Sequence, residues 1–352
     1  MFRKAFLALR ARPKRALLCL TLLASVAMNV LAYRHAWLLT HFVGVGDRPP
    51  SPEVMTLWQK AEAALCGVQI PKPRNAKTPA DYELPFEARR FVTRDGLECA
   101  AWRVPCPDGQ RSQGLCLLFH GFANAKDSML PAARAFHEFG YDTLLVDFRG
   151  SGESDGHATT IGYREADDVA AACAYAKRQW PDAPILLYGR SMGSVAILRA
   201  IATQQVRPTA LILEAPFDRL LATTRNRCRT AGLPAFPLAE LLVFWGGVQH
   251  GYSGFAHNPV AYAKAVECPT LLLHGDCDIR VSPAEARQVF DRLPGKKTWA
   301  LLAGAGHENL AAKHHAEWLA AVEGFLSEIA PKRRAENLRS VGAALNTSET
   351  AE

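Results

Sequence analysis

The sequence predicts an α/β protein with a mostly parallel sheet, an antiparallel N-terminal hairpin and helices on both faces of the sheet. Short runs of almost wholly apolar residues alternate with helical stretches, as expected for strands that are buried on both faces. A serine between two glycines stands where one of these strands passes into a helix. Two further polar loops follow later apolar strands, so polar residues collect at the strand ends.

The chain has 352 residues, of which 49% are hydrophobic, and one sizeable domain with extensions is expected. The net charge of +7 belongs to residues 1–46, which hold seven Arg and Lys residues and no Asp or Glu. The remainder is therefore neutral overall. The sequence thus predicts no nucleic-acid partner, because the basic residues form a leader and not a binding face.

Residues 16–33 form an apolar segment that is interrupted only by Thr21, Ser25 and Asn29. As a helix this segment would rise about 27 Å, close to the ~30 Å hydrocarbon core of a bilayer. Two interpretations compete: an uncleaved signal anchor, or a signal peptide that is cleaved to release a secreted protein. Arg34 and His35 followed by apolar residues resemble an interfacial collar and favour the anchor. Both interpretations place the folded domain outside the cytoplasm, on the periplasmic or extracellular side.

Residues 47–85 are rich in proline and contain one helix-like piece, residues 54–66, so we expect a spacer between membrane and folded body. The predicted domain covers residues 86–330. It opens with two strand-like runs, residues 86–92 and 97–102, which flank Arg94-Asp95-Gly96 and predict an antiparallel hairpin.

The rest of the domain alternates between strands and helices. The predicted helices begin near Ser128, Tyr163, Met192, Pro283 and Glu308. In a parallel sheet of this kind, chemistry is expected at the carboxyl ends of the strands. The predicted strands are residues 115–119, 142–146, 185–188, 210–213, 270–273 and 299–302.

One connection is unusually long. Residues 217–266 contain no strand-like run, and we expect a small helical cap over the pocket at the strand ends, with an ordinary crossover helix as the alternative. After residue 330 the apolar periodicity is lost, and residues 331–352 are expected to form a flexible tail.

Gly189-Arg190-Ser191-Met192-Gly193 lies between the predicted strand 185–188 and a helical stretch. This is the pattern of a nucleophile elbow, in which glycines allow the close backbone approach that a strained, outward-pointing serine requires. Such a serine needs a base and an orienting acid. In this architecture the oxyanion donors are the backbone N–H of Met192 and one from the loop after an earlier strand, here Phe122.

The later loops supply both partners. Asp278 follows the strand 270–273 and His307 follows the strand 299–302, which gives the order serine, acid, base. Asp276 is the main rival of Asp278, and Asp218 is a weaker one. Among the competing histidines, His120 and His274 each precede a glycine in a turn and are expected to support the loop. His314 and His315 lie on a predicted helix and are expected to be surface or packing residues.

Eight of the nine cysteines lie outside the apolar segment, a number that permits disulfides without establishing any. Cys268 and Cys277 flank one strand and should be too far apart to pair. No Cys or His cluster has metal-site spacing, so we expect no structural metal, and the serine chemistry needs no cofactor.

Five motifs together resemble those of α/β-hydrolases, in particular the BEM46-like and ABHD-type hydrolases, and they are also similar to monoglyceride lipases and S33 peptidases. The resemblance covers about residues 86–330. It implies an α/β-hydrolase fold, Ser191 as nucleophile, Asp278 as acid, His307 as base, and oxyanion donors at Phe122 and Met192. The loop from Asp147 to Gly156 is structural in such relatives. The motifs are His120-Gly121-Phe122, Asp147-Phe148-Arg149-Gly150-Ser151-Gly152-Glu153-Ser154, Gly189-Arg190-Ser191-Met192-Gly193, His274-Gly275-Asp276-Cys277-Asp278 and Gly306-His307.

These features predict a membrane-tethered serine hydrolase that cleaves a carboxylic ester or thioester through an acyl-enzyme. The apolar cap and the anchor favour a lipid-like acyl substrate such as a lysophospholipid or a monoacylglycerol. An S33-type serine aminopeptidase is the alternative within the enzymes. A non-catalytic α/β-hydrolase scaffold that acts as an interaction module is the alternative outside them.

Overall fold

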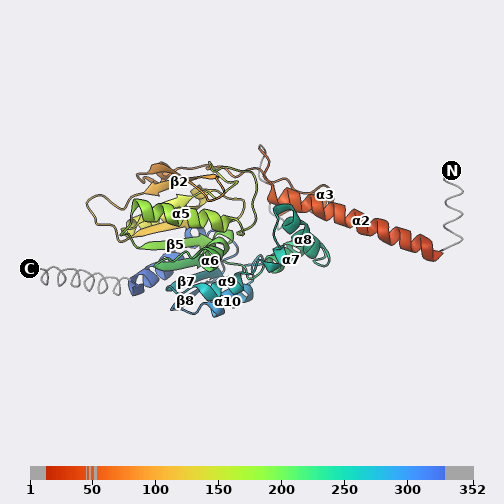
Figure 1. Cartoon of the computed structure of the whole chain (residues 1–352). Helices are drawn as coiled ribbons and strands as arrows, with labels where there is room; N and C mark the ends of the chain where they lie inside the picture. The colour runs from red at the N-terminus through yellow and green to blue at the C-terminus, as the bar shows by residue number, and fades with distance from the viewer. Residues whose placement is uncertain (1–12, 45, 47–48, 51–53, 330–352) are drawn as a thin grey trace, which may run out of the picture.

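A single sheet of eight strands, in the order β1-β2-β4-β3-β5-β6-β7-β8, organises the chain. The computed structural model describes residues 13–44, 46, 49–50 and 54–329 (Figure 1). The basic residues before position 13 and the expected tail 331–352 lie outside the described residues. The strands are β1 (Glu87–Val92), β2 (Glu98–Val104), β3 (Leu115–Phe119), β4 (Asp142–Val146), β5 (Ile185–Arg190), β6 (Ala210–Glu214), β7 (Thr270–Gly275) and β8 (Lys297–Leu302).

Strands β1 and β2 form the expected antiparallel hairpin, with Phe91 opposite Cys99. Strand β2 also runs antiparallel to β4, while all pairings from β4 to β8 are parallel. Strands β3, β4 and β6 are buried at every position, which explains their continuous apolar sequences. The predicted fold class, a mostly parallel sheet with an antiparallel N-terminal hairpin, is confirmed.

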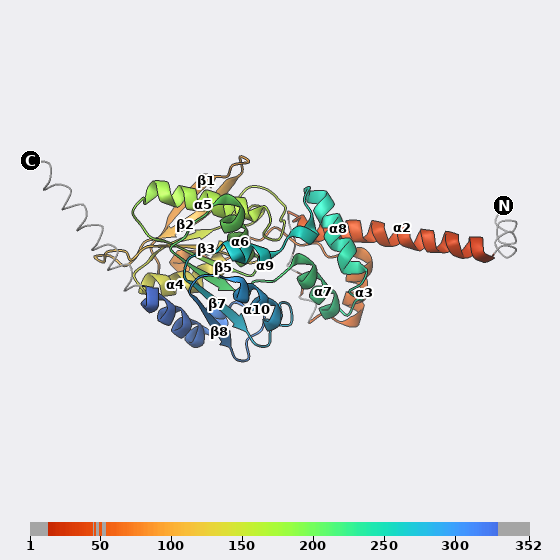
Figure 2. The ribbon, with the colours of Figure 1, turned by 60° about the horizontal axis from the view of Figure 1, so that its bottom comes forward.

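Helices cover both faces of the sheet, as Figure 2 shows. One buried cluster joins the sheet to α5 (Glu165–Gln179), α6 (Met192–Gln204) and α10 (Pro283–Arg292). A second cluster on the other face contains α4 (Leu130–Glu138) and a C-terminal helix over residues 315–329. Shorter helical turns complete the described chain, namely η1 (Pro79–Tyr82), η2 (Lys126–Met129), η3 (Gly254–Ala256), α9 (Pro259–Tyr262), η4 (Ala263–Ala265) and α11 (Leu310–Lys313).

The long connection between β6 and β7 carries two helices, α7 (Leu220–Thr230) and α8 (Leu238–His250), which we call the cap. The cap lies at the side of the sheet domain from which the N-terminal helix projects (Figures 1 and 2). Only Ala239, Val243 and Gly247 of α8 are buried, although the helix is mostly apolar.

The N-terminal helix α2 (Pro13–Thr40) is longer than the apolar segment that the sequence shows. Within it, Leu17–Thr40 is long and apolar enough to cross a membrane, by length and composition. Its first part is exposed, whereas Ala32, Ala36 and Leu38 are buried against the folded body. The helix is therefore partly free and partly built into the domain.

The segment for which we expected a spacer contains α3 (Leu57–Cys66), close to the expected helix 54–66. After α3 the chain lies on the domain: Gly152 N donates to Pro73 O at 2.8 Å, and Lys72 Nζ donates to Ser154 O at 2.7 Å. Residues 70–75 are thus held by the loop that follows β4. No disulfide bond joins any two of the described cysteines.

Candidate active site

Ser191 stands between β5 and α6 with φ 50° and ψ −112°. A non-glycine residue in this region costs about 1–3 kcal/mol, and such strain is held by the surrounding structure. The flanking glycines are required here: a Cβ on Gly189 would collide with the Ser194 backbone, and one on Gly193 would collide with the Phe119 carbonyl oxygen. The turn therefore lifts the Ser191 side chain out of the carboxyl end of the sheet.

A buried carboxylate, Glu214, supports this turn from below. Its backbone oxygen accepts from Ser191 N at 2.7 Å and from Ser194 Oγ at 3.0 Å. Its side chain faces Arg190 Nε at 3.2 Å and accepts a hydrogen bond from the Tyr188 hydroxyl. Burial raises the pKa of Glu214, and the Arg190 guanidinium opposes that rise. Glu214 thus holds the backbone N–H of the serine and, three residues later, the hydroxyl of Ser194.

No sequence motif marks Glu214 as part of the site. The available signal was an acidic residue that ends an otherwise wholly apolar strand, Ala210–Glu214, next in the chain after the elbow helix. Charged groups are rarely buried without a partner. A carboxylate at this position therefore predicts a cation or a hydrogen-bond donor at the same edge of the sheet.

Ser191, His307 and Asp278 come together although they are far apart in the chain. Ser191 Oγ lies 3.0 Å from His307 Nε2, and His307 Nδ1 lies 2.6 Å from Asp278 Oδ2. The other carboxylate oxygen of Asp278 accepts from the backbone N–H groups of Arg280 and Val281, each at 2.9 Å. These contacts orient the carboxylate toward the imidazole, and they form a continuous chain from hydroxyl to carboxylate.

The surroundings of His307 and Asp278 shift the pKa values of both side chains. Burial lowers the pKa of His307, and Arg227 and Arg190 lower it further against the opposing effect of Asp278. Burial would raise the pKa of Asp278, but its bonds to His307 and to the Val281 N–H outweigh burial and lower it. At neutral pH the imidazole is therefore neutral and the carboxylate is charged.

The rival acids face elsewhere. Asp276 is exposed and its Oδ1 accepts from Gly304 N at 2.7 Å. Asp218 is buried and bonds to the backbone and side chain of its neighbour Arg219, at 2.6 and 3.0 Å. Of the three carboxylates, Asp278 is the one in hydrogen-bond contact with His307.

The competing histidines also have other partners. His120 is fully buried, contacts Gly121 O through Nδ1 at 2.8 Å and accepts from Phe148 N at 3.1 Å. His274 Nε2 donates to Val281 O at 2.9 Å. On the C-terminal side, His314 pairs with Glu308 and His315 with Ala311 O. His120 and His274 thus support the loops on which the site is built.

The loop after β3 passes beside Ser191. A Cβ built on Gly121 would lie 3.7 Å from the Ser191 Cβ, so the backbone directly before Phe122 lies beside the serine. Met192 begins α6, where backbone N–H groups have no partner within the helix. The two predicted donor positions are thus neighbours of the site in the chain: Phe122 follows Gly121, and Met192 follows Ser191.

The chain segment after α2 contacts this same loop. Phe42 packs on Phe122 with ring centroids 6.3 Å apart, in a buried cluster with Ile70 and Ala123. Phe42 N donates to His157 O at 2.6 Å, and Thr159 N donates to Thr40 O at 2.9 Å. Residues just after the N-terminal helix are thus part of the wall behind the loop after β3.

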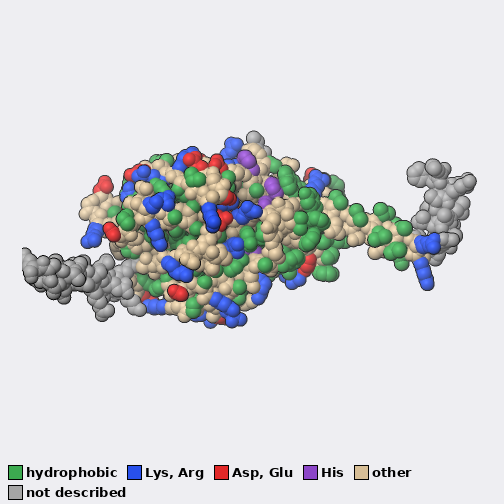
Figure 3. All heavy atoms as spheres, in the orientation of Figure 1, with side chains coloured by type: hydrophobic (Ala, Val, Ile, Leu, Met, Phe, Trp, Pro, Cys, Tyr) green, Lys and Arg blue, Asp and Glu red, His purple; other side chains and the backbone are tan. Residues whose placement is uncertain are grey.

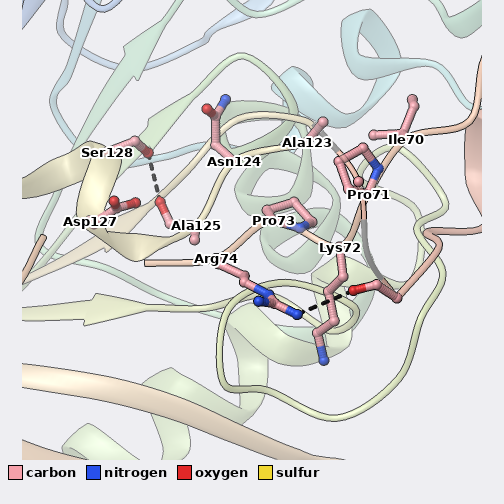
Figure 4. Close-up of a pocket in the computed structure, with 12 residues that line it drawn as sticks. Ile70, Pro71, Lys72, Pro73, Arg74, Ala123, Asn124, Ala125, Asp127 and Ser128 are labelled. Carbon is pink, nitrogen blue, oxygen red and sulfur yellow. Dashed lines mark hydrogen bonds between the residues drawn. The ribbon is translucent and has the colours of Figure 1, made fainter. Parts of the chain in front are cut away.

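A cavity of about 440 Å³ opens between this N-terminal segment and residues 123–128. Figure 4 shows Ala123 and Asn124 in the upper part of the view and Lys72 and Arg74 below them. Arg74 donates to Gly44 O at 3.2 Å across the wall. Neither Ser191 nor His307 lines this cavity, so it lies behind the loop after β3 and not at the serine itself. In the described part of the chain, no three His, Cys, Asp or Glu side chains come together as a metal site would require.

A family model described as serine aminopeptidase, S33, matches residues 110–234. These residues contain the loop after β3, the elbow and all of α7. The matched region stops before the loops that carry Asp278 and His307.

Three known proteins are similar to the chain over 42% to 68% of its length. The uncharacterized protein YqkD of Bacillus subtilis is 24% identical over 68% of this chain and 83% of its own length. Protein bem46 of Schizosaccharomyces pombe is 26% identical over 42% of this chain and 49% of its own. Lysophosphatidylserine lipase ABHD12 of Danio rerio is 22% identical over 52% of this chain and 48% of its own. The chain thus spans about half the length of these last two relatives.

Among solved structures, the Pyrococcus furiosus esterase Pf2001 superposes with a TM-score of 0.62. That match covers 74% of this chain and 97% of the esterase, at 24% sequence identity. At this identity the likeness concerns the fold, and it agrees with the strand order described above.

Proposed function

Because this chain is an α/β-hydrolase of the BEM46- and ABHD-like kind, we propose that it is a serine hydrolase of carboxylic esters or thioesters. The observation that carries the proposal is the continuous contact from Ser191 Oγ through His307 to Asp278. Ser191 is the proposed nucleophile, His307 the base and Asp278 the acid that orients it.

The reaction proceeds through an acyl-enzyme. His307 Nε2 takes the proton as Ser191 Oγ attacks the carbonyl carbon, and Asp278 stabilises the imidazolium that forms. His307 then gives this proton to the leaving alkoxide or thiolate, which departs as an alcohol or thiol. Water attacks the acyl-enzyme in the same way, with His307 again as base, and releases the carboxylic acid and free Ser191.

Two backbone N–H groups, those of Phe122 and Met192, are proposed to stabilise the oxyanion. Support comes from the position of the Gly121 backbone beside Ser191 and from Met192 at the first position of α6. A donor of this kind contributes a factor of about 10²–10³ to kcat, because it acts where negative charge develops.

The packing of Phe42 on this loop leads to a prediction. Phe42→Ala is expected to lower kcat by about 10- to 100-fold, because a small displacement of the Phe122 N–H weakens oxyanion stabilisation. Steady-state kinetics with a p-nitrophenyl ester measures this effect. Phe91→Ala is the matched control, since Phe91 is equally buried in β1 but stacks on Tyr175. Equal losses of kcat in both variants would show that the effect is one of general stability.

The pH profile gives a second prediction. The neutral form of His307 is the active base, and burial lowers its pKa below the ordinary 6.5. Activity should therefore remain as the pH falls through 6.5 and decline only as it passes below the lowered pKa. The acid limb of kcat/KM against pH, measured with a soluble ester, checks this. A midpoint at or above 6.5 would contradict a buried, neutral base.

The substrate is proposed to be a lipid-like acyl ester such as a lysophospholipid or monoacylglycerol. The mostly apolar helix α8 beside an apolar N-terminal helix supports this, and so does the likeness to lysophosphatidylserine lipases over about half their length. The same helix is proposed to anchor the protein as an uncleaved signal anchor. By the positive-inside rule, the catalytic domain then lies outside the cytoplasm.

An S33-type serine aminopeptidase is the second candidate, since the matching family model carries that description. A peptidase of that kind needs an acidic group to hold a free amino terminus. The acids between residues 217 and 266 are Asp218 and Glu240, and both pair with arginines of the same segment: Arg219 with Asp218, and Arg225 with Glu240 at 2.9 Å through Nε. With neither acid available for an ammonium group, the ester substrate is favoured.

The test is a panel of p-nitrophenyl esters of increasing chain length beside aminoacyl-p-nitroanilides, with the full chain in detergent. We expect ester hydrolysis and kcat/KM that rises with acyl length. Faster hydrolysis of the anilides would contradict the ester proposal in favour of a peptidase. Turnover of neither class would contradict the catalytic function and favour a non-catalytic scaffold.

A further inference from the structure

The cap helix α8 packs along the N-terminal helix α2, as Figures 1 and 2 show. Trp245 Nε1 donates to Asn29 Oδ1 at 3.1 Å, and the Trp245 ring meets Tyr33 edge-on with centroids 5.4 Å apart. Gln249 Nε2 donates to Tyr33 O at 2.8 Å, and His250 stacks on His41. The contacts thus run from Asn29 to the end of α2.

The position of these contacts on α2 determines their depth in a bilayer. Exposed cations flank the apolar residues 16–33, with Arg15 before them and Arg34 after them. Eighteen helical residues rise about 27 Å, so a span that covers the ~30 Å hydrocarbon core needs all of them. Asn29 lies five residues before Arg34, about 7 Å inside the boundary. Trp245, which bonds to Asn29, must therefore lie at the same depth.

The surface around Trp245 is apolar and open. Phe244 and Val248 of α8 are 48% and 54% exposed, and Phe236, just before α8, is 75% exposed. Figure 3 shows hydrophobic side chains gathered where α8 meets α2 and continuing along α2. In water such a continuous patch would be unfavourable.

Helix α3 extends the same surface. Its end lies against α2, where His35 Nε2 contacts Ala64 O at 3.1 Å. Leu57, Trp58 and Leu65 are 87%, 80% and 71% exposed, and their spacing places them along one side of the helix. Tryptophan at such a position is typical of the membrane interface.

The cap also reaches the catalytic elements. Val243 of α8 packs in a buried cluster with Val195 and Val281. Val195 lies one helical turn after Ser191, and Val281 lies three residues after Asp278 and donates its N–H to that carboxylate. Helix α8 thus exposes apolar side chains on one side, and on the other it contacts residues next to the proposed nucleophile and acid.

We infer that α8, the Phe236 loop and α3 form a docking surface for the lipid bilayer, immersed in the leaflet next to the catalytic domain. The bilayer is the occupant because the surface is continuous with the α2 span: Trp245 lies within the depth of the span, and α3 meets α2 at His35, next to the boundary at Arg34. An acyl ester then reaches Ser191 from the leaflet through the cap and does not have to cross water. This inference rests on the proposed anchor and the proposed hydrolase function.

Depth measurements test the docking. The experiment uses the full chain with the exposed Cys19, Cys66 and Cys277 replaced by serine. A single cysteine is then introduced at Val26, Phe244 or Val92 and labelled with a fluorophore. These positions are on α2, on α8 and, as the control, on β1, and all three are exposed. In nanodiscs, nitroxide lipids should quench the labels at Val26 and Phe244, whereas a water-soluble quencher should reach only the label at Val92.

The possible results distinguish docking of the cap on the bilayer from anchoring by α2. Lipid quenching at Val26 with aqueous quenching at Phe244 would keep the anchor and overturn the docking. Aqueous quenching at both positions would overturn the anchor itself. Protection of Phe244 from both quenchers would show that a second copy of the chain covers the surface, which also overturns the inference.

Kinetics test the access route. Two values of kcat/KM are compared: one for a long-chain monoacyl ester in vesicles, and one for a soluble short-chain ester. The double variant Phe236→Ser and Phe244→Ser should lower the ratio of the first value to the second by about tenfold. Val92→Ser, an equally exposed change on β1, should leave this ratio unchanged. An unchanged ratio in the double variant would overturn access through the leaflet. No turnover of either ester by the unaltered chain would instead contradict the proposed function.

Discussion

Ser191→Ala is expected to lower kcat on a p-nitrophenyl ester by at least about 10⁴-fold, because no acyl-enzyme can form without the hydroxyl. The His307 imidazole would retain Asp278 but lose its partner at Nε2, which lies 3.0 Å from Ser191 Oγ. Covalent labelling by a fluorophosphonate should disappear in parallel. Labelling is the sharper measurement, since it requires an activated serine and no particular substrate.

The control for this variant is a serine far from the site. Ser327→Ala, on the exposed side of the C-terminal helix, should keep full labelling and turnover. Thermal unfolding of Ser191→Ala should stay close to that of the unaltered chain, because its backbone contact to Glu214 O is retained. Persistent labelling of Ser191→Ala would show that another nucleophile reacts and would refute the assignment.

The second large effect is expected at the acid. Asp278→Asn should lower kcat by about 10⁴-fold, since an amide does not stabilise the imidazolium and can hold the ring in the wrong tautomer. The carboxylate lies 2.6 Å from His307 Nδ1. The loss should appear in kcat with both short and long esters, because the chemical step itself is affected.

Asp276→Asn is the matched control, with the same change two residues earlier in the same loop. Asp276 is exposed and accepts from Gly304 N, so this variant should keep kcat within about twofold of the unaltered chain. Thermal unfolding of Asp278→Asn is needed beside the kinetics, because its Oδ1 also holds the Arg280 and Val281 N–H groups. If Asp276→Asn were the inactive variant, Asp276 would be the acid.

Local patterns predicted much of the fold. Wholly apolar runs such as Leu115–Phe119 form strands because both faces of the sheet are covered, and a run of this kind has few other ways to bury itself. The glycines around Ser191 mark the turn because any Cβ would collide with neighbouring backbone. These signals lie within a few residues of the feature that they predict.

Other features had no such signal. The carboxylate of Glu214 lies beneath the serine turn because β6 pairs with β5, a contact between separate strands. The bond between Asn29 and Trp245 joins residues 216 positions apart. The sequence indicated a spacer after the apolar segment, but it could not show that Phe42 reaches Phe122 or that α8 lies along α2.

The sequence by itself determined the fold class, the strained turn at Ser191 and the order in which candidate acid and base follow it. These depend on short-range sterics and on the period of apolar residues, which each segment carries within itself. Only the tertiary structure decided which carboxylate of the 276–278 loop faces His307, and which surface of the cap meets the N-terminal helix. Both depend on directions of side chains from distant segments, and those directions exist only after the segments have packed together.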